Sequence, residues 1–471
     1  MSSNSELATS TNPTSPSSTL VGGILGQDAD VDDSENKEYP KEEDLGRILT
    51  GNPGGMTDGV KAEESPKHGG FGGNAVKEPD TPAPVQQLSD DKVEKRQLDS
   101  EKPKGVRDDD YPDLLMDEGR PGDGAVAYQA AGIRFAPWNI PYRRRLQTVA
   151  VLIHSLSIAS TVSFFFFLCA IPLTWPLLLP YLLHMLLSKA ATDGRLRFRS
   201  ERFRRLRVWK FFADYYPAKL HKTHDLPPTR KYIFGYHPHG IISHGAFAAF
   251  ATEALGFSEK FPGITNSLLT LDSNFRIPIY RDYILGMGIL SVSKESITNT
   301  LTQGGPNGQG MGRAVTIVVG GARESLEAQP GTMHLVLGER KGFVKMAIRT
   351  GADLVPVLAF GENDLYDQVS PREHPTIRRV QMFALRTLKF TLPFLHGRGI
   401  FNYDVGLMPY RRPLNIVVGK PIQVAQRSDG NFDSSEIDRL HRLYVAELQK
   451  MWERYKDLFA RERTEEMQIM K

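Results

Sequence analysis

The chain has 471 residues and a formal net charge of +3, which results from 58 Lys/Arg and 55 Asp/Glu. Its single cysteine, Cys169, excludes a disulfide framework and a thiolate metal cluster. The length allows more than one domain, and the balanced total charge conceals two regions of opposite sign.

The N-terminal region is acidic and poor in apolar residues. Residues 1–120 contain 26 Asp/Glu, 13 Lys/Arg and three aromatic residues. Such a segment buries too little apolar surface to offset its conformational entropy, so we expect a disordered acidic tail over residues 1–135. The rest of the chain carries 45 basic and 29 acidic residues. This surplus suits anionic lipid headgroups or a polyanionic substrate.

The next feature is a run over residues 146–188 that lacks Asp, Glu, Lys and Arg. A bilayer-spanning helix needs about 20 apolar residues, so this run is long enough for two spans. Pro172, Pro176 and Pro180 lie where a turn between the spans would fall. Arginines flank both ends of the run, and basic flanks favour the cytosolic side. We therefore predict a membrane hairpin with both ends cytosolic, in preference to a buried helical pair in a soluble core.

Residues 189–214 form a basic segment in which arginines alternate with apolar residues. Leu196, Phe203 and Leu206 can share one face of a helix, which favours a helix lying in the membrane interface. Nucleic-acid binding is the usual alternative for an arginine-rich stretch. Next to a membrane hairpin, the interfacial helix is the simpler interpretation.

Residues 215–471 have the pattern of an α/β domain. Apolar runs that are nearly continuous predict strands covered on both faces, and helical patterns lie between them. The strands are expected at 231–236, 314–319 and 353–360, and the helices around 243–255 and 341–350. A helical apolar stripe near the C-terminus indicates a core helix, for which Ser435 and Asp438 provide a capping start.

Two histidines follow the first expected strand in the sequence Tyr-His-Pro-His-Gly, residues 236–240. Histidine can take up and return a proton near neutral pH, so His237 or His239 could deprotonate a hydroxyl for attack on an activated acyl group. In the simplest alternative, one histidine packs in the core and the other faces water. A zinc site with His244 is a further alternative, but no nearby carboxylate or cysteine completes a recognisable ligand spacing.

A second group of polar residues follows the second expected strand. Glu324 lies just beyond a Gly320-Gly321 turn, where it could orient an imidazole or stabilise its cation. The two glycines allow backbone amides to approach a ligand, including an oxyanion. The alternative for Glu324 is a carboxylate stabilised by a helix N-terminus. Guanidinium groups suited to phosphate oxygens are offered by Arg276, Arg281 and Arg323, although each could simply be solvated.

Together these motifs resemble the type-2 diacylglycerol acyltransferase family, from about residue 135 to the C-terminus. The resemblance rests on His-Pro-His-Gly and on the segments 320–326, 340–343, 354–363, 396–399 and 418–422. It implies a glycerolipid-acyltransferase-like mixed sheet with flanking helices, and acyl transfer from acyl-CoA to diacylglycerol to form triacylglycerol. It also implies substrate contacts by Arg340 and Lys341, and no metal or cofactor besides acyl-CoA as co-substrate. The implied location is the endoplasmic reticulum membrane with access to lipid droplets.

The family is more distantly similar to the glycerol-phosphate acyltransferases, whose signature is a histidine followed by four residues and an aspartate. His239 would be that histidine, Glu324 would match their glutamate, and Arg281 stands near their phosphate-binding arginine. The fifth residue after His239 is, however, His244 and not Asp. The resemblance therefore leaves Glu324 as the expected orienting group and His237 as an alternative base.

Three alternative functions differ in the motifs that they require. A monoacylglycerol or wax-alcohol acyltransferase would share these motifs, so the acceptor is left open. A non-catalytic hairpin protein that coats lipid droplets would need neither histidine nor Glu324. A lipid hydrolase lacks the Gly-x-Ser-x-Gly nucleophile motif. Self-association is left open.

Overall fold

The structure is a computed structural model, and it describes residues 128–130, 133–135, 139–368, 379, 381, 383, 395–401, 403–427 and 433–471. The tail expected over residues 1–135 lies outside the described residues, except for two short antiparallel strands. These are β1 (Tyr128–Ala130) and β2 (Ile133–Phe135).

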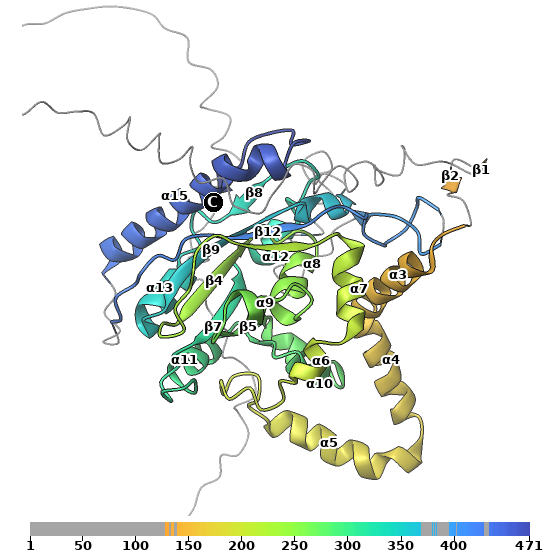
Figure 1. The fold of residues 1–471 in the computed structure, drawn as a ribbon. Coiled ribbons are helices and arrows are strands. Elements are labelled where there is room, and N and C mark those ends of the chain that lie inside the picture. The colour runs from red at the N-terminus through yellow and green to blue at the C-terminus, as the bar shows by residue number, and fades with distance from the viewer. Residues whose placement is uncertain are drawn as a thin grey trace, which may run out of the picture.

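Within the described residues, a seven-stranded mixed sheet forms the centre of the molecule, with the strand order β3-β12-β9-β4-β7-β5-β6 (Figure 1). The strands are β3 (Lys219–Lys222), β4 (Tyr232–His237), β5 (Thr265–Thr270), β6 (Leu290–Ser291), β7 (Arg313–Val318), β9 (Asp353–Phe360) and β12 (Asn415–Val418). The apolar runs at 231–236, 314–319 and 353–360 are β4, β7 and β9. The prediction of these strands is confirmed.

The direction of the strands determines which residues meet. Strands β9, β4, β7, β5 and β6 are parallel, whereas β12 pairs antiparallel with β9 and parallel with β3. The segments that follow β4, β7, β5 and β9 therefore emerge at the same edge of the sheet. This edge, called here the carboxyl edge, is where a parallel sheet usually places a binding site.

Helices cover both faces of the sheet, which explains why β4 and β9 are buried at every residue. On β9, Val355, Val357 and Ala359 belong to one apolar cluster, and Leu354 and Leu358 belong to the other. The first cluster contains residues of α7 (Arg207–Tyr215), η4 (Phe247–Ala251), α9 (Phe257–Lys260) and α10 (Tyr280–Gly286). The second contains residues of α11 (Lys294–Thr302), α13 (Gly342–Thr350) and α15 (Ser434–Phe459).

The helices expected from the sequence form with some differences. The helix expected around 341–350 is α13. The region 243–255 forms only a short α8 (His244–Ala246), which continues into the π-helical turn η4. The long helix α15 begins two residues earlier than predicted, because Asp433 caps it by accepting a hydrogen bond from the Ser435 amide (2.9 Å). The pairing of Ser435 with Asp438 as its cap was therefore wrong.

The apolar run 146–188 forms three helical pieces instead of two continuous spans. They are α3 (Tyr142–Ser155), α4 (Ser157–Cys169) and α5 (Trp175–Leu187), with the short turn η3 (Pro172–Thr174) before α5. None of the described helices is by itself long and apolar enough to cross a bilayer; α3 and α4 together have enough apolar residues but are bent by 62°. Helix α3 packs with the globular part through buried Ala150 and Val151. Helices α4 and α5 extend away from the sheet (Figure 1).

The basic segment 189–214 is not one continuous helix. It contains the single turn α6 (Glu201–Arg204) and then α7, and the break between them falls at Arg205 and Leu206. Arg204 is buried and forms an ion pair with Glu253 at 2.7 Å. Trp209 and Phe212 pack in the core. The end of this segment therefore belongs to the globular fold, because its apolar residues cover the sheet.

The remaining elements lie around the carboxyl edge or at the periphery. They are η5 (Asp272–Arg276), α12 (Gly321–Ser325), β8 (His334–Val336), η6 (Glu362–Leu365), β10 (Asp367–Gln368), β11 (Leu395–His396) and β13 (Gln468–Met470). Strand β13 pairs with β8, and β10 pairs with β11.

Candidate active site

The site is centred on the loop that follows β4 and starts with the His-Pro-His-Gly motif. Strand β4 lies between β7 and β9 and is parallel to both. The loop therefore lies at the middle of the carboxyl edge, with the segment after β7 on one side and the segment after β9 on the other. Gly240 and Ser243 adopt left-handed backbone conformations (φ of 58° and 54°), and α8 begins at His244.

His237 is the last residue of β4 and is fully buried. Its Nε2 lies 3.0 Å from the hydroxyl of Tyr444 on α15, and this hydroxyl donates its hydrogen to the carbonyl oxygen of Gly235. Burial lowers the pKa of His237 to about 3, so its imidazole is neutral at pH 7. His237 thus joins the sheet to α15 inside the core, which is a structural position.

His239 is partly exposed, and its geometry defines its tautomer. Its Nδ1 lies 3.0 Å from the carbonyl oxygen of Gly240. Because a carbonyl oxygen can only accept, Nδ1 carries the hydrogen and Nε2 is the nitrogen that can take up a proton. Burial lowers the pKa of His239, which keeps the ring neutral near pH 7. The structure therefore presents His239 in the form required of a general base.

Glu324 lies next to the histidine loop, but it does not contact the imidazole. Its Oε1 accepts a hydrogen bond from the backbone amide of His239, and its Oε2 accepts one from the amide of Val336 at 2.7 Å. The expected orientation of the ring by Glu324 is thus corrected: the carboxylate holds the backbone that carries the ring. Burial raises the pKa of Glu324 to about 7, and the two amides and the charge of Arg340 oppose this shift.

The two glycines before Glu324 serve different purposes. A Cβ atom at Gly320 would overlap the Glu324 carboxylate, so Gly320 provides the space for that side chain. Gly321 adopts a left-handed conformation (φ of 58°), and no atom lies within 4 Å of the Cβ position at this residue. The close packing at Gly320 is with the protein's own carboxylate, whereas Gly321 faces open space.

The cationic residues predicted to bind substrate are spread over the molecule. Arg276 is exposed and lies 3.4 Å from Asp272, and Lys341 forms an ion pair with Asp438 on α15 at 2.8 Å. Arg323 is exposed on α12, next to Glu324. Arg281 is only 2% exposed, and its Nε and Nη1 have no hydrogen-bond partner among the described residues. Of these cations, Arg281 is the one whose burial requires an explanation.

The position at which the glycerol-phosphate acyltransferases have aspartate is occupied by a buried histidine. His244 stacks near Tyr366 and Tyr216, with its Nε2 3.4 Å from the Tyr366 hydroxyl. The carboxylate that lies nearby is Glu362, which follows β9 and is 2% exposed. Glu362 lies in the segment 354–363 that carries the family resemblance, and the sequence assigned it no role. The signal that would have identified it is an acidic residue directly after a nearly continuous apolar run and a glycine.

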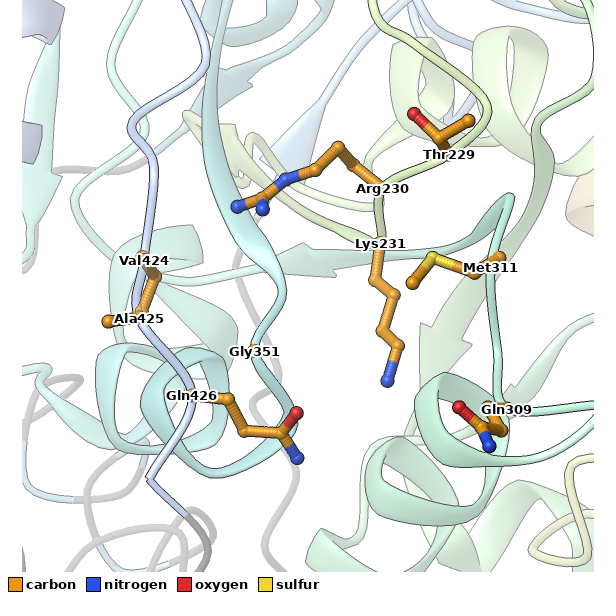
Figure 2. A pocket seen from close by; sticks show the side chains of 9 residues that line it. All are labelled: Thr229, Arg230, Lys231, Gln309, Met311, Gly351, Val424, Ala425 and Gln426. Carbon is orange, nitrogen blue, oxygen red and sulfur yellow. The ribbon is translucent and has the colours of Figure 1, made fainter. Parts of the chain in front are cut away.

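Two cavities formed by described residues lie away from His239. One of about 270 Å³ lies at the opposite edge of the sheet, beside the amino ends of β4 and β9, where Arg230 and Lys231 line it together with Gln426 (Figure 2). Arg230 is paired with Asp353 there. A second cavity, of about 330 Å³, is lined by Asn363, Trp452 and neighbouring residues. None of the predicted site residues lines either cavity.

A neutral histidine on a carboxylate-anchored loop at the edge of an α/β sheet has the geometry that proton abstraction requires. The family model described as "Diacylglycerol acyltransferase" matches residues 165–470. Diacylglycerol O-acyltransferase 2A of Umbelopsis ramanniana is 49% identical to the chain over 339 residues, covering 72% of this chain and 94% of the relative. For 2-acylglycerol O-acyltransferase 1 of Bos taurus the identity is 44% over 327 residues, covering 69% and 95%.

The chain therefore belongs to the diacylglycerol acyltransferase family. Among solved structures, a 1-acyl-sn-glycerophosphate acyltransferase from Thermotoga maritima matches with a TM-score of 0.31 and 13% identity, covering 65% of this chain and 97% of that chain. That similarity is too low to support a conclusion about this protein. The family resemblance expected from the motifs is confirmed by the family match and the relatives.

Proposed function

We propose that this protein transfers a fatty acyl group from acyl-CoA to the free hydroxyl of diacylglycerol, forming triacylglycerol. Membership of the family and the names of the relatives support acyl transfer to a glycerolipid. The observation that carries the mechanism is the hydrogen bond of His239 Nδ1 to the Gly240 carbonyl, because it leaves Nε2 free to act as the base.

In the proposed reaction, His239 Nε2 removes the proton from the acceptor hydroxyl. The oxygen forms a bond to the thioester carbonyl carbon, and the negative charge moves to the carbonyl oxygen. When the carbonyl re-forms, the carbon–sulfur bond breaks and the CoA thiolate leaves. The thiolate then takes up the proton that His239 holds. The buried His237 is not the base in this proposal, since its imidazole contacts Tyr444 inside the core.

The cationic residues are proposed to bind the phosphates of acyl-CoA. Arg281 is the strongest candidate, because a buried guanidinium without full hydrogen bonding is stabilised by an anion. Arg323 is exposed beside the histidine loop and could contact a phosphate without leaving another partner. For Arg276, Arg340, Lys341 and the Gly320-Gly321 amides, substrate binding stays a prediction from the sequence.

Helices α4 and α5 are proposed to lie in the bilayer, with the sheet on the cytosolic side of the endoplasmic reticulum. Neither helix has a buried residue, and Leu173, Leu177 and Leu186 are 88%, 80% and 78% exposed. Exposed apolar surface of this extent is costly in water. The hydroxyl of Tyr181 on α5 bonds to Asp282 (2.6 Å) on α10, so these helices are anchored near the carboxyl edge. Access to lipid droplets follows from the same surface.

The choice of acceptor alcohol differs among relatives that are equally similar to this chain. 2-acylglycerol O-acyltransferase 1 of Bos taurus and a second Umbelopsis ramanniana enzyme, diacylglycerol O-acyltransferase 2B, are both 44% identical to this chain. Monoacylglycerol and long-chain alcohols are therefore tested beside diacylglycerol. A protein that only coats lipid droplets would have no use for the anchored His239 loop.

The test uses microsomes from cells that lack their own triacylglycerol synthesis, supplied with labelled acyl-CoA and each acceptor. Wild type should form labelled triacylglycerol, and His239→Ala should lose at least about 100-fold in rate, because a general base contributes that much or more. Exposed His224 provides the control, and His224→Ala should retain the wild-type rate at equal expression.

The pH dependence adds a second readout. Because burial lowers the pKa of His239, the acid-side midpoint of the wild-type kcat/KM profile should lie below the ordinary histidine pKa of about 6.5. Equal rates for wild type and His239→Ala would contradict the assignment of the base. Product from monoacylglycerol or an alcohol alone would replace diacylglycerol as the acceptor.

A further inference from the structure

A second buried carboxylate, Glu362, holds the far end of the histidine loop. Strand β9 ends at Phe360, Gly361 turns the chain with a φ of 92°, and Glu362 begins η6. Its Oε2 accepts hydrogen bonds from the Tyr236 hydroxyl (2.6 Å) and from the Gly245 amide (2.9 Å). Oε1 is buried and has no hydrogen-bond partner among the described residues.

The Glu362 side chain also packs directly against the loop. A Cβ atom at Gly240 would lie 2.6 Å from Glu362 Cγ, and one at Gly245 would lie 2.5 Å from Oε2. Only residues without a side chain leave this space, so the loop and the carboxylate fit closely. Gly240 also provides the carbonyl that accepts the hydrogen of His239 Nδ1. Displacing Gly240 would therefore turn the imidazole of His239.

The two carboxylates come from opposite sides of the loop. Glu324 follows β7 and binds the His239 amide, whereas Glu362 follows β9 and binds the Gly245 amide. Strands β7 and β9 are the two neighbours of β4. The loop is thus fixed at its first and last turns by groups from independent strands.

We propose that Glu362 is a positioning residue for acyl transfer, which sets the direction of the His239 imidazole through its contacts with Gly240 and Gly245. The inference rests on the proposed role of His239 as the base. It requires one acceptor oxygen at the position of Oε2 and a side chain long enough to reach Gly245. Gln has both features, Asp lacks the length, and Ala lacks the oxygen.

The experiment compares Glu362→Gln, Glu362→Asp and Glu362→Ala in the full-length protein, purified in detergent and assayed with acyl-CoA and diacylglycerol. The rate is normalised to folded protein, measured from the monodisperse fraction and the melting temperature. We expect Asp and Ala to lower kcat at least about tenfold while KM for acyl-CoA stays within about twofold, because small misplacements of a reacting group affect the chemical step. Gln should keep at least about half of the wild-type kcat.

The matched control is Asp364→Asn. Asp364 lies in the same turn and accepts a hydrogen bond from the amide of Gly331 (2.7 Å), away from the histidine loop. It should retain the wild-type kcat per folded protein.

The proposal is overturned if Glu362→Ala or Glu362→Asp keeps the wild-type kcat per folded protein, or if Gln is as defective as Asp. A loss that follows only the amount of folded protein would also overturn it. If Glu362→Ala does not fold, the comparison of kcat between Glu362→Asp and Glu362→Gln still tests the proposal, since both variants retain a polar side chain. An inactive wild type would contradict the proposed function itself, and His239→Ala, assayed in parallel, tests the base on which the inference depends.

Discussion

At the scale of single residues, the position of a hydrogen bond separates the two histidines of the motif. Burial lowers the pKa of both rings, yet His237 contacts Tyr444 in the core, whereas His239 bonds to the Gly240 carbonyl of its own loop. The carboxylate of Glu324 bonds to the backbone amide of His239 and not to the imidazole. Glu324 therefore fixes the backbone position of His239. An active site needs such support to hold its reacting atom in place.

The hydrogen bonds of Glu324 lead to a prediction opposite to that for Glu362. Both oxygens of Glu324 accept from backbone amides, so the –NH₂ group of Glu324→Gln would face the N–H of His239 or Val336. Leaving a buried donor unsatisfied costs about 1–3 kcal/mol. We expect Glu324→Gln to unfold at lower denaturant concentration and to lose at least about tenfold in kcat.

Denaturant unfolding and steady-state kinetics measure these effects. The control is Glu339→Gln, which changes an exposed carboxylate between β8 and α13. Wild-type stability and kcat in Glu324→Gln would show that the two amide bonds are dispensable.

At the scale of elements, the histidine loop depends on the contact between β4 and α15. Tyr444 on α15 reaches the backbone of β4 at Gly235 and the ring of His237. The missing side chain at Gly235 makes this approach possible, because a Cβ atom there would overlap the Tyr444 hydroxyl. A helix from the end of the chain thus supports the strand that carries the site.

This contact predicts a coupled pair of substitutions. Gly235→Ala should destabilise the protein by about 1–3 kcal/mol, because overpacking forces the helix or the strand to shift. In the Tyr444→Phe background the same change should cost less, since the hydroxyl is absent. A double-mutant cycle by denaturant unfolding measures the coupling. Additive effects of the two substitutions would contradict the close approach of the Tyr444 hydroxyl to Gly235.

At the scale of the whole molecule, apolar surface is distributed unevenly. The sheet is covered by helices on both faces, whereas α4 and α5 extend from it with their apolar side chains exposed (Figure 1). The globular part thus buries its own apolar surface, whereas the apolar side chains of α4 and α5 favour an apolar environment. A lipid bilayer provides that environment and also holds the proposed acceptor.

Charged residues on α5 should therefore weaken membrane attachment. Leu177→Lys with Leu186→Lys places two ammonium groups on the exposed helix, at a cost of about 5 kcal/mol if both positions lie in the hydrocarbon region. We expect the double variant to move into the soluble fraction on carbonate extraction. Leu443→Lys on α15 is the control, because Leu443 is 44% exposed on the globular part and should leave extraction unchanged. Equal retention of all three proteins would argue against membrane burial of α5.

The sequence by itself determined the central strands and the motifs that follow them. The apolar runs that became β4, β7 and β9 can be read directly, because strands covered on both faces are apolar at nearly every residue. The motifs directly after these strands had to meet if the strands were parallel neighbours, which the structure confirms. Family membership could be inferred from the same motifs, since it depends on local residue order.

Only the tertiary structure decided the partner of each polar group. Arg204 at the end of α6 is buried in an ion pair with Glu253, and the cap of α15 belongs to Asp433. Glu324 binds a backbone amide 85 residues away in the chain, and Glu362 binds one 117 residues away. Hydrogen bonds require atoms within about 3 Å of each other. Sequence patterns define which face of an element is buried, but the packing of the elements sets such distances.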